Sequence, residues 1–234
     1  MKLLFVNACV REHSRTLLLA RQLLSRLSAQ ACEIRLEDLG LKPLTRCSLA
    51  RRDDLLRQGK WEDPSLKLAR QFADADCIVI AAPYWDLGFP ALLKIYLETV
   101  TVSGITFCYE EGRPRGLCKA RKLYYITTAG GPILSDFGYP YVRSLAENLY
   151  GIQETRCIRA ENLDMDGVDV ACILEETIES INKEDLNDVD NLPQRIVSKG
   201  VHGDSQGLAE ASNVSLLLCG KQREAHQKEE HHEK

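Results

Sequence analysis

Residues 77–106 read CIVIAAPYWDLGFPALLKIYLETVTVSGIT, and this stretch decides the fold. Its apolar run Cys77–Ala82 is rich in β-branched residues and ends at a proline, which predicts a buried central strand. A polar and aromatic turn, Tyr84–Gly88, follows, and Pro90 then opens a helix because its φ angle is preset for a helix start. Ligands of open parallel sheets bind beyond the carboxyl ends of the strands. We therefore expect this turn to form the floor of a site for a flat ligand.

Strand and helix patterns alternate from residue 2 to residue 182. Apolar runs predict five strands, over Lys2–Asn7, Ala31–Leu36, Cys77–Ala82, Lys122–Thr127 and Ile152–Ile158. Helical spacing and cap residues predict helices over Arg15–Ala29, Leu49–Arg57, Asp63–Ala73, Pro90–Val102, Tyr141–Tyr150 and Val168–Asn182. A small hairpin is expected within Ile105–Arg115. The alternation predicts an α/β fold of three layers, with a doubly wound, five-stranded parallel sheet and right-handed crossovers.

The composition narrows the class of protein. The 234 residues are 44% hydrophobic and 27% charged, which is enough for one substantial core. A net charge of -4 gives no electrostatic footprint for nucleic acid, and no apolar run is long enough to span a membrane. The apolar stretch Leu3–Val6 is too short for a secretion signal. The nine cysteines form no C-x-x-C pair, so we expect reduced thiols, no zinc site and a cytoplasmic location.

The sequence pattern changes after residue 183. Glycine, proline and charged residues mark residues 184–234, so we expect one domain over 1–183 and a tail over 184–234 that is flexible or loosely docked. The tail contains GDSQG at 203–207, a glycosylation sequon at Asn213, and His226, His231 and His232. GDSQG does not follow a buried strand, so it does not predict a hydrolase, and the other features predict no site.

The loop after the first strand reads NACVREHSRT at residues 7–16. It has neither the G-x-G-x-x-G fingerprint nor the P-loop lysine, so neither a dinucleotide fold nor P-loop chemistry is indicated. Ser14 and Thr16 place hydroxyls beside Arg15 at the start of a helix, where free N–H groups and the helix dipole favour an anion. This pattern predicts a phosphate site. The alternative is that Ser14 only caps the helix.

Two further loops follow strands of the same sheet. Pro83–Phe89 offers aromatic side chains, with the alternative that Trp85 packs in the core. Thr127–Pro132 contains Gly130 and Gly131, which allow close backbone approach to a ligand or form an ordinary turn. In the strand order 2-1-3-4-5 the first, third and fourth strands are adjacent, so the three loops share one crevice.

Three segments resemble the flavodoxin-like NAD(P)H:quinone oxidoreductases, a family that includes the FMN-dependent azoreductases. They are residues 7–16, the stretch APYWDLGFPALLKIYLETVTVSGITFCY at 82–109, and TTAGG at 127–131. The resemblance runs from residue 2 to about residue 182. It implies a flavodoxin-like fold, FMN as cofactor, and a homodimer with the flavin at its interface.

The resemblance also implies which residues bind FMN. Ser14, Arg15 and Thr16 match the segment that holds the phosphate, residues 84–87 match the one bordering the isoalloxazine, and residues 128–131 match the one at its other edge. The resulting set is Cys9, Ser14, Arg15, Thr16, Pro83, Tyr84, Trp85, Asp86, Leu87, Thr128, Ala129, Gly130 and Gly131. Cys9 stands where serine is common, Ala129 where arginine often lies, and Tyr84, Asp86 and Leu87 depart from the azoreductase loop Pro-Met-Tyr-Asn-Phe.

These observations favour an FMN-dependent NAD(P)H oxidoreductase that passes hydride through the flavin to a quinone or similar small-molecule acceptor, with ping-pong kinetics; azo compounds are possible acceptors. The flavin carries the chemistry, so no catalytic side chain and no metal are expected. An NAD(P)H-dependent FMN reductase and a flavodoxin-type electron carrier are the alternatives. A cysteine-based redox regulator is a third, suggested only by the number of cysteines.

Overall fold

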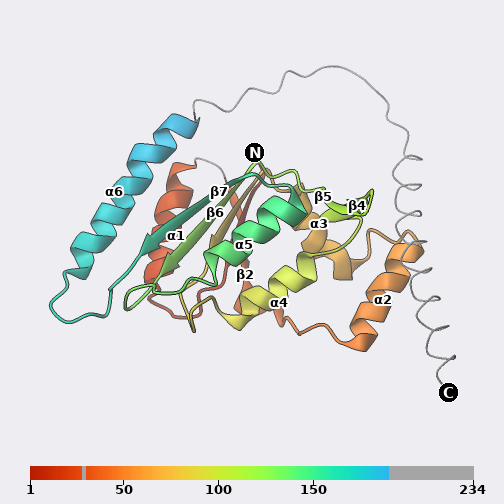
Figure 1. The fold of residues 1–234 in the computed structure, drawn as a ribbon, viewed down its shortest axis with the longest axis horizontal. Helices are drawn as coiled ribbons and strands as arrows, with labels where there is room; N and C mark the ends of the chain where they lie inside the picture. The colour runs from red at the N-terminus through yellow and green to blue at the C-terminus, as the bar shows by residue number, and fades with distance from the viewer. Residues whose placement is uncertain (28–29, 190–234) are drawn as a thin grey trace.

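The computed structural model describes residues 1–27 and 30–189. A five-stranded parallel sheet in the order β2-β1-β3-β6-β7 forms its centre (Figure 1). Its strands are β1 (Leu3–Asn7), β2 (Ala31–Arg35), β3 (Cys77–Ala81), β6 (Lys122–Thr128) and β7 (Glu154–Ala160). In the order of the predicted strands this is 2-1-3-4-5, so the predicted flavodoxin-like arrangement is confirmed.

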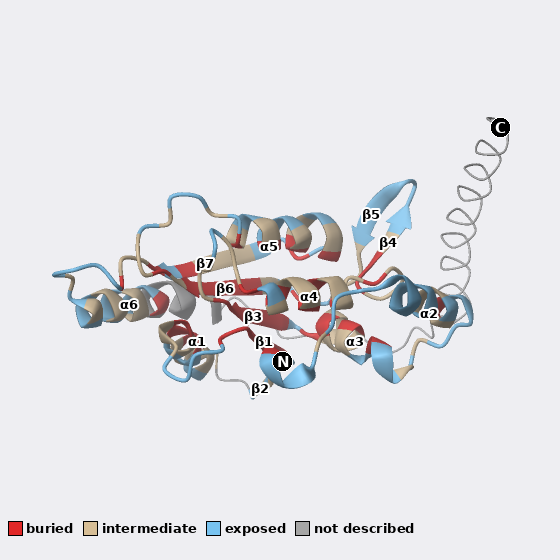
Figure 2. Ribbon diagram, turned by 90° about the horizontal axis from the view of Figure 1, so that it is seen from below, coloured by how far each residue is buried: buried red, intermediate tan, exposed pale blue. Residues whose placement is uncertain are grey.

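Helices cover both faces of this sheet and make the outer two layers. They are α1 (Arg15–Arg26), α3 (Lys67–Asp74), α4 (Ala91–Val100), α5 (Tyr139–Leu145) and α6 (Val170–Val189). A further helix, α2 (Arg46–Arg57), packs through Leu56 in a separate cluster with Leu66, Ala69 and Val102. Helices α1 and α6 pack on one face, and α3, α4 and α5 pack on the other. Figure 2 shows the buried residues along the strands and the exposed residues on the outer sides of the helices.

The alternation of side chains along β1 divides the core between the two faces. Leu3 and Phe5 pack with α1 and α6, whereas Leu4 and Val6 pack toward α3, α4 and α5. All four are buried, as expected for a central strand of a sheet covered on both sides.

The predicted helix Tyr141–Tyr150 and strand Ile152–Ile158 differ from the structure in their bounds. The chain from Tyr139 is α-helical to Leu145 and then forms a π-helical turn over Ala146–Tyr150. Gly151 ends this turn in the left-handed region (φ 80°), and the Ile152 N–H donates to the Ala146 carbonyl at 2.9 Å. Ile152 therefore closes the helix, and β7 begins only at Glu154.

The predicted excursion after α4 is an antiparallel hairpin of β4 (Phe107–Glu110) and β5 (Arg113–Gly116). It projects from the body of the molecule, with most of its residues exposed (Figure 2). Its base lies against the backbone of Gly151, because a Cβ atom added at Gly116 would be 2.2 Å from the Gly151 nitrogen. Only glycine fits where these two backbones meet.

Several expectations concern residues outside the described ranges. The GDSQG segment at 203–207, Asn213 and the three histidines of the tail all lie there, and the division into residues 1–183 and 184–234 stays a prediction. Within residues 1–27 and 30–189, no His, Cys, Asp or Glu cluster could hold a metal ion. Over the same residues, none of the helices has the length and apolar character needed to cross a membrane.

Candidate functional site

A cleft of about 260 Å³ lies where β1, β3, β6 and β7 end. Nine of the thirteen predicted residues line it: Ser14, Arg15, Thr16, Pro83, Tyr84, Trp85, Thr128, Ala129 and Gly130. The structure adds five residues to that set: Val10, Arg11 and His13 from the predicted first loop, and Leu163 and Asp164 from the loop after β7. Cys9, Asp86, Leu87 and Gly131 are outside this lining. The three predicted loops therefore share one crevice, as expected for the carboxyl ends of adjacent parallel strands.

Ser14 caps helix α1 at the wall of the cleft. Its Oγ accepts from the Leu17 N–H at 3.2 Å, and its carbonyl accepts from the Leu18 N–H at 3.0 Å. The N–H groups of Arg15 and Thr16 begin the helix and have no acceptor within it. Capping and anion binding are therefore compatible here, because the Ser14 hydroxyl can still donate its proton while its oxygen accepts. The start of α1 has the donors and the dipole that an anion needs.

Thr16 and Arg15 both join α1 to the other loops. Thr16 is buried, and its Oγ1 lies 2.6 Å from the Thr128 Oγ1, a hydrogen bond between the first and third loops. The Arg15 Nη1 donates to the Asp164 Oδ1 at 2.7 Å and to the Leu163 carbonyl at 2.9 Å. Arg15 and Thr16, two of the three side chains that the sequence suggested for a phosphate, thus make contacts within the protein.

A chain of hydrogen bonds fixes the start of the first loop. The Cys9 N–H donates to the Asn7 Oδ1 at 3.0 Å, and the Asn7 Nδ2 donates to the Glu33 Oε1 at 2.9 Å. Arg21 completes the chain, with its Nη2 2.6 Å from the Glu33 Oε2. Because Asn7 is buried, its amide needs these partners, and the edge strand β2 thereby supports the loop that enters the cleft.

The second loop is a two-residue turn fastened to β6. The Tyr84 N–H donates to the Thr128 carbonyl at 3.0 Å, and the Tyr84 hydroxyl donates to the Ser135 carbonyl at 2.7 Å. Trp85 and Gly88 exchange backbone hydrogen bonds across the turn. Asp86 and Leu87 between them have φ angles of 50° and 63°, so both are left-handed. This geometry matches a type I′ turn, which places their exposed side chains outside the lining of the cleft.

Leu87 is a strained choice for this turn, and replacing it by glycine should stabilise the protein. A leucine in the left-handed conformation costs about 1–2 kcal/mol. Glycine adopts this conformation without strain, but it loses more backbone entropy on folding, which cancels about 0.5–1 kcal/mol of the gain. Leu87→Gly should therefore raise the free energy of unfolding by about 0.5–1 kcal/mol, measured in denaturant. Leu134→Gly is the matched control, because Leu134 is also exposed but does not have a positive φ angle. The control should lose stability; a loss in Leu87→Gly as well would show that the turn is not strained.

Gly130 in the third loop faces a carboxylate of the protein. A Cβ atom added there would lie 2.4 Å from the Asp164 Oδ2, whereas nothing lies within 4 Å of one added at Gly131. Gly130 thus leaves room for Asp164. This close approach is made by a side chain of the same protein, and Gly130 also lines the cleft.

The loop after β7 is the part of the site that sequence reasoning missed. Its Leu163 N–H donates to the Ala129 carbonyl at 3.2 Å and its Asp164 N–H to the Gly130 carbonyl at 2.8 Å. It has neither glycine pairs nor aromatic residues at the cleft. Its position in the sheet could have predicted it, because β7 is parallel to the other strands and its carboxyl end therefore lies at the same edge of the sheet.

Four thiols have raised pKa values and so give no support for a cysteine-based regulator. Burial raises the pKa of the Cys9 thiol to about 11, although the nearby Ser14 lowers it, and burial raises those of Cys118 and Cys157 to about 12. Glu176 raises the pKa of the exposed Cys172 by its charge. A reactive cysteine needs a shift in the opposite direction.

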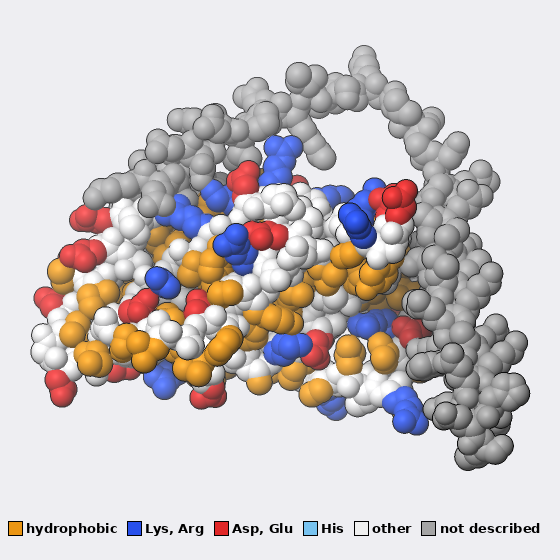
Figure 3. Space-filling model, viewed as in Figure 1, with side chains coloured by type: hydrophobic (Ala, Val, Ile, Leu, Met, Phe, Trp, Pro, Cys, Tyr) orange, Lys and Arg blue, Asp and Glu red, His pale blue; other side chains and the backbone are white. Residues whose placement is uncertain are grey.

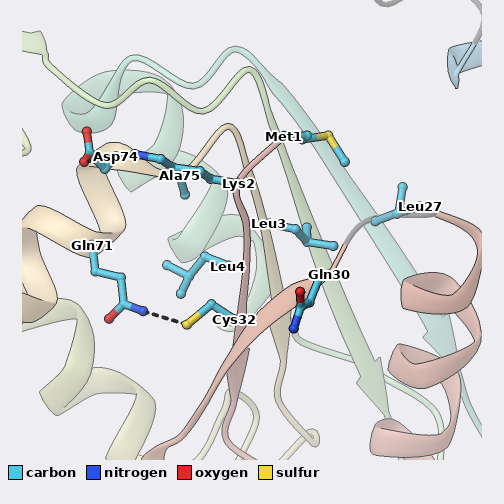
Figure 4. A pocket seen from close by; sticks show the side chains of 10 residues that line it. All are labelled: Met1, Lys2, Leu3, Leu4, Leu27, Gln30, Cys32, Gln71, Asp74 and Ala75. Atoms are coloured by element: carbon cyan, nitrogen blue, oxygen red, sulfur yellow. Dashed lines mark hydrogen bonds and ion pairs between the residues drawn. The ribbon is translucent and has the colours of Figure 1, made fainter.

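A larger cavity, of about 770 Å³, lies at the amino ends of the strands (Figure 4). Its charged residues pair with each other, with Lys2 Nζ 3.4 Å from Asp74 Oδ2, and the Gln71 Nε2 donates to the Cys32 Sγ at 3.1 Å. Leu27 and Gln30 in its wall flank residues 28–29, which are outside the described ranges. Ligands of parallel sheets bind at the other end, so this cavity is not the candidate site.

Exposed hydrophobic side chains lie in the loops that follow β1, β3, β6 and β7. They are Val10, Leu87, Leu134, Phe137 and Met165, of which Leu134 is 86% exposed. Figure 3 shows further hydrophobic side chains on the face that carries α4 and α5. An apolar rim of this kind is typical of a surface that binds an apolar ligand or a protein.

Comparisons with known proteins agree with this geometry. The profile of a family described as having a flavodoxin-like fold matches residues 1–184. The FMN-dependent NADH:quinone oxidoreductase 2 of Clostridium acetobutylicum is 42% identical over 135 residues, which are 55% of this chain and 67% of that protein. The FMN-dependent NADH:quinone oxidoreductase of Clostridium perfringens is 44% identical over 117 residues, 49% of this chain and 59% of that protein. The matched segments thus span about two thirds of the first relative and about three fifths of the second.

A solved structure gives the same fold. The FMN-dependent NADH-azoreductase from Bacillus anthracis, solved in complex with FMN, aligns with a TM-score of 0.68 at 20% identity. The alignment covers 82% of this chain and all of that one. At this identity the match supports the three-layer architecture, whereas the residues of the site are argued from the contacts above.

Proposed function

Because the chain belongs to the family with the flavodoxin-like fold, we propose that it is an FMN-dependent NAD(P)H oxidoreductase that reduces a quinone or a similar small acceptor. The relatives named as FMN-dependent NADH:quinone oxidoreductases support this assignment and favour NADH as the donor. Azo compounds are acceptors to test, since an azoreductase shares the fold.

One observation carries the proposal: the start of α1 opens into the cleft beside the aromatic turn. The N–H groups of Arg15 and Thr16 and the hydroxyl of Ser14 can donate to a phosphate there. Arg11 and His13 line the same wall. Tyr84 and Trp85 border the cleft on the side of β3, where a flat ring can lie against them. Anion donors next to an aromatic surface fit a flavin mononucleotide.

The protein's part in the reaction is to bind and orient. FMN bound here would supply the redox chemistry, the transfer of a hydride from NAD(P)H and of two electrons to the acceptor. The side chains of Ser14 and Thr128 and the backbone of residues 128–130 would hold the cofactor, and Trp85 would shield one side of the ring from water. The other predicted residues, Cys9, Asp86, Leu87 and Gly131, support these loops without lining the cleft.

We also propose that two copies of the chain complete the site. The cleft of about 260 Å³ is smaller than the range of roughly 300–1,000 Å³ that is usual for small-molecule sites, so part of the flavin lies outside it. The exposed rim of Val10, Leu87, Leu134 and Phe137 suits a partner that covers this part. A homodimer is therefore the proposed assembly, and a cytoplasmic location stays a prediction.

The proposal is tested by flavin content and kinetics of the purified chain. After FMN is added and gel filtration has removed the excess, about one FMN per chain should remain. Initial rates with NADH and a quinone should give parallel double-reciprocal lines, because both substrates use the same exposed side of the flavin. Loss of flavin on the column with reduction of free FMN would identify an FMN reductase. Retained flavin without NAD(P)H oxidation would identify an electron carrier.

A further inference from the structure

Arg15 connects two walls of the cleft that are far apart in sequence. It lies in the first turn of α1, and its Nη1 bonds both the Asp164 carboxylate at 2.7 Å and the Leu163 carbonyl at 2.9 Å. One guanidinium nitrogen therefore holds the backbone and the side chain of the loop after β7. The geometry of the pair restrains that loop more than a contact between two side-chain tips alone.

The loop after β7 is itself joined to the third loop. Backbone hydrogen bonds link Leu163 to Ala129 at 3.2 Å, Asp164 to Gly130 at 2.8 Å, and Asn162 to Gly131 at 3.2 Å. The Asp164 carboxylate also fills the space that a side chain at residue 130 would need. Residues 129–131 and 162–164 thus form one hydrogen-bonded unit, which Arg15 fastens to α1.

The charge of Arg15 is already balanced at this position. Its carboxylate partner lines the same cleft, so the pair has little net charge to offer a phosphate. Arg11 and His13 also line the cleft, and neither has a carboxylate partner among residues 1–27 and 30–189. Arg11 and His13 can therefore attract an anion to the cleft without Arg15.

We propose that Arg15 is a positioning residue: with Asp164 it latches the loop after β7 to the start of α1, and so it fixes the wall made by Ala129 and Gly130. The effect of Arg15 on the affinity for a flavin is then the same whether or not the flavin carries a phosphate. The inference rests on the proposed function for the identity of the ligand. It departs from the phosphate-binding role that the sequence suggested for Arg15.

Comparing riboflavin with FMN distinguishes the two possible roles of Arg15, as a latch or as a phosphate ligand, because riboflavin has no phosphate. Dissociation constants are measured by flavin fluorescence for the wild type, Arg15→Ala, Asp164→Ala and the double variant. Each single substitution should weaken FMN and riboflavin by the same factor, about threefold to tenfold, since the pair is partly exposed. The double variant should be no weaker than either single variant, because both remove the same latch.

Arg143→Ala is the matched control. Arg143 pairs with Glu147 at the same 2.7 Å and is also partly exposed, but it is on α5 and does not line the cleft. It should leave both dissociation constants unchanged. A selective loss of FMN in Arg15→Ala, with riboflavin unaffected, would overturn the inference. So would a normal affinity in Asp164→Ala.

Hydrogen exchange of the flavin-free protein tests the latch without any ligand. The amides of Leu163 and Asp164 should exchange faster in Arg15→Ala and in Asp164→Ala than in Arg143→Ala. Unchanged exchange would refute the latch whatever the flavin does. If the wild type binds neither flavin, the proposed function fails, while the exchange rates still decide whether Arg15 holds the loop.

Discussion

Replacing Ser14 by aspartate should weaken FMN binding by about a hundredfold or more, while helix α1 remains capped. Aspartate is as good an N-cap as serine, and its charge interacts favourably with the helix dipole, so the free protein should keep its stability. The same carboxylate would face the phosphate at the start of α1, where two anions repel in a partly desolvated cleft. The measurement is a fluorescence titration with FMN, together with the thermal midpoint of the flavin-free protein.

Ser14→Asn is the control for this experiment. Asparagine also caps the helix but is neutral, so its loss of FMN affinity should be within about tenfold. Riboflavin, which has no phosphate, should bind Ser14→Asp and Ser14→Asn alike. Equal FMN affinity in the two variants would place the phosphate away from α1. It would also remove the observation on which the proposed function rests.

Replacing Gly116 by alanine should have the largest effect on stability. The added Cβ would lie 2.2 Å from the Gly151 nitrogen and from the Tyr150 carbonyl carbon, and both are backbone atoms. Backbone cannot move aside like the end of a flexible side chain, so the base of the hairpin must separate from the turn after α5. We expect a loss of about 3 kcal/mol or more in the free energy of unfolding, measured in denaturant.

Gly112→Ala in the same hairpin is the matched control. Gly112 has a φ of 76°, but nothing lies within 4 Å of a Cβ atom added there. Its substitution therefore introduces backbone strain alone, about 1 kcal/mol. The difference between the two variants measures the clash. Similar losses would mean that the contact between Gly116 and Gly151 relaxes without cost.

The fold could be predicted because its signals are local. The β-branched run at residues 77–82 and the apolar run at residues 2–7 fit only buried strands, and each is followed by a helix. Element ends were harder: Ile152 is as apolar as a strand residue, but it closes the π-helical turn through Ala146. An apolar residue at a helix end and one at a strand start look the same in sequence.

The site was predictable as far as its loops and no further. Each of the three predicted loops has a recognisable sequence feature: a helix cap after β1, an aromatic turn after β3 and paired glycines after β6. All three loops reach the cleft. The pairing of Arg15 with Asp164 joins residues 149 positions apart, so no local pattern indicates it. For the same reason no local pattern showed that Asp164 needs the small size of Gly130, which also lines the cleft.

Because the residues of the cleft come from most of the described chain, ligand binding affects how fast the protein is degraded in a cell. The lining of the cleft runs from Val10 to Asp164, so no fragment contains it and only the completed sheet can bind there. A ligand that binds the native chain alone lowers the unfolded fraction by the factor 1 + [L]/Kd. Proteases act mainly on the unfolded fraction. The supply of flavin would therefore set the rate at which the protein is degraded, and hence the amount of protein that accumulates.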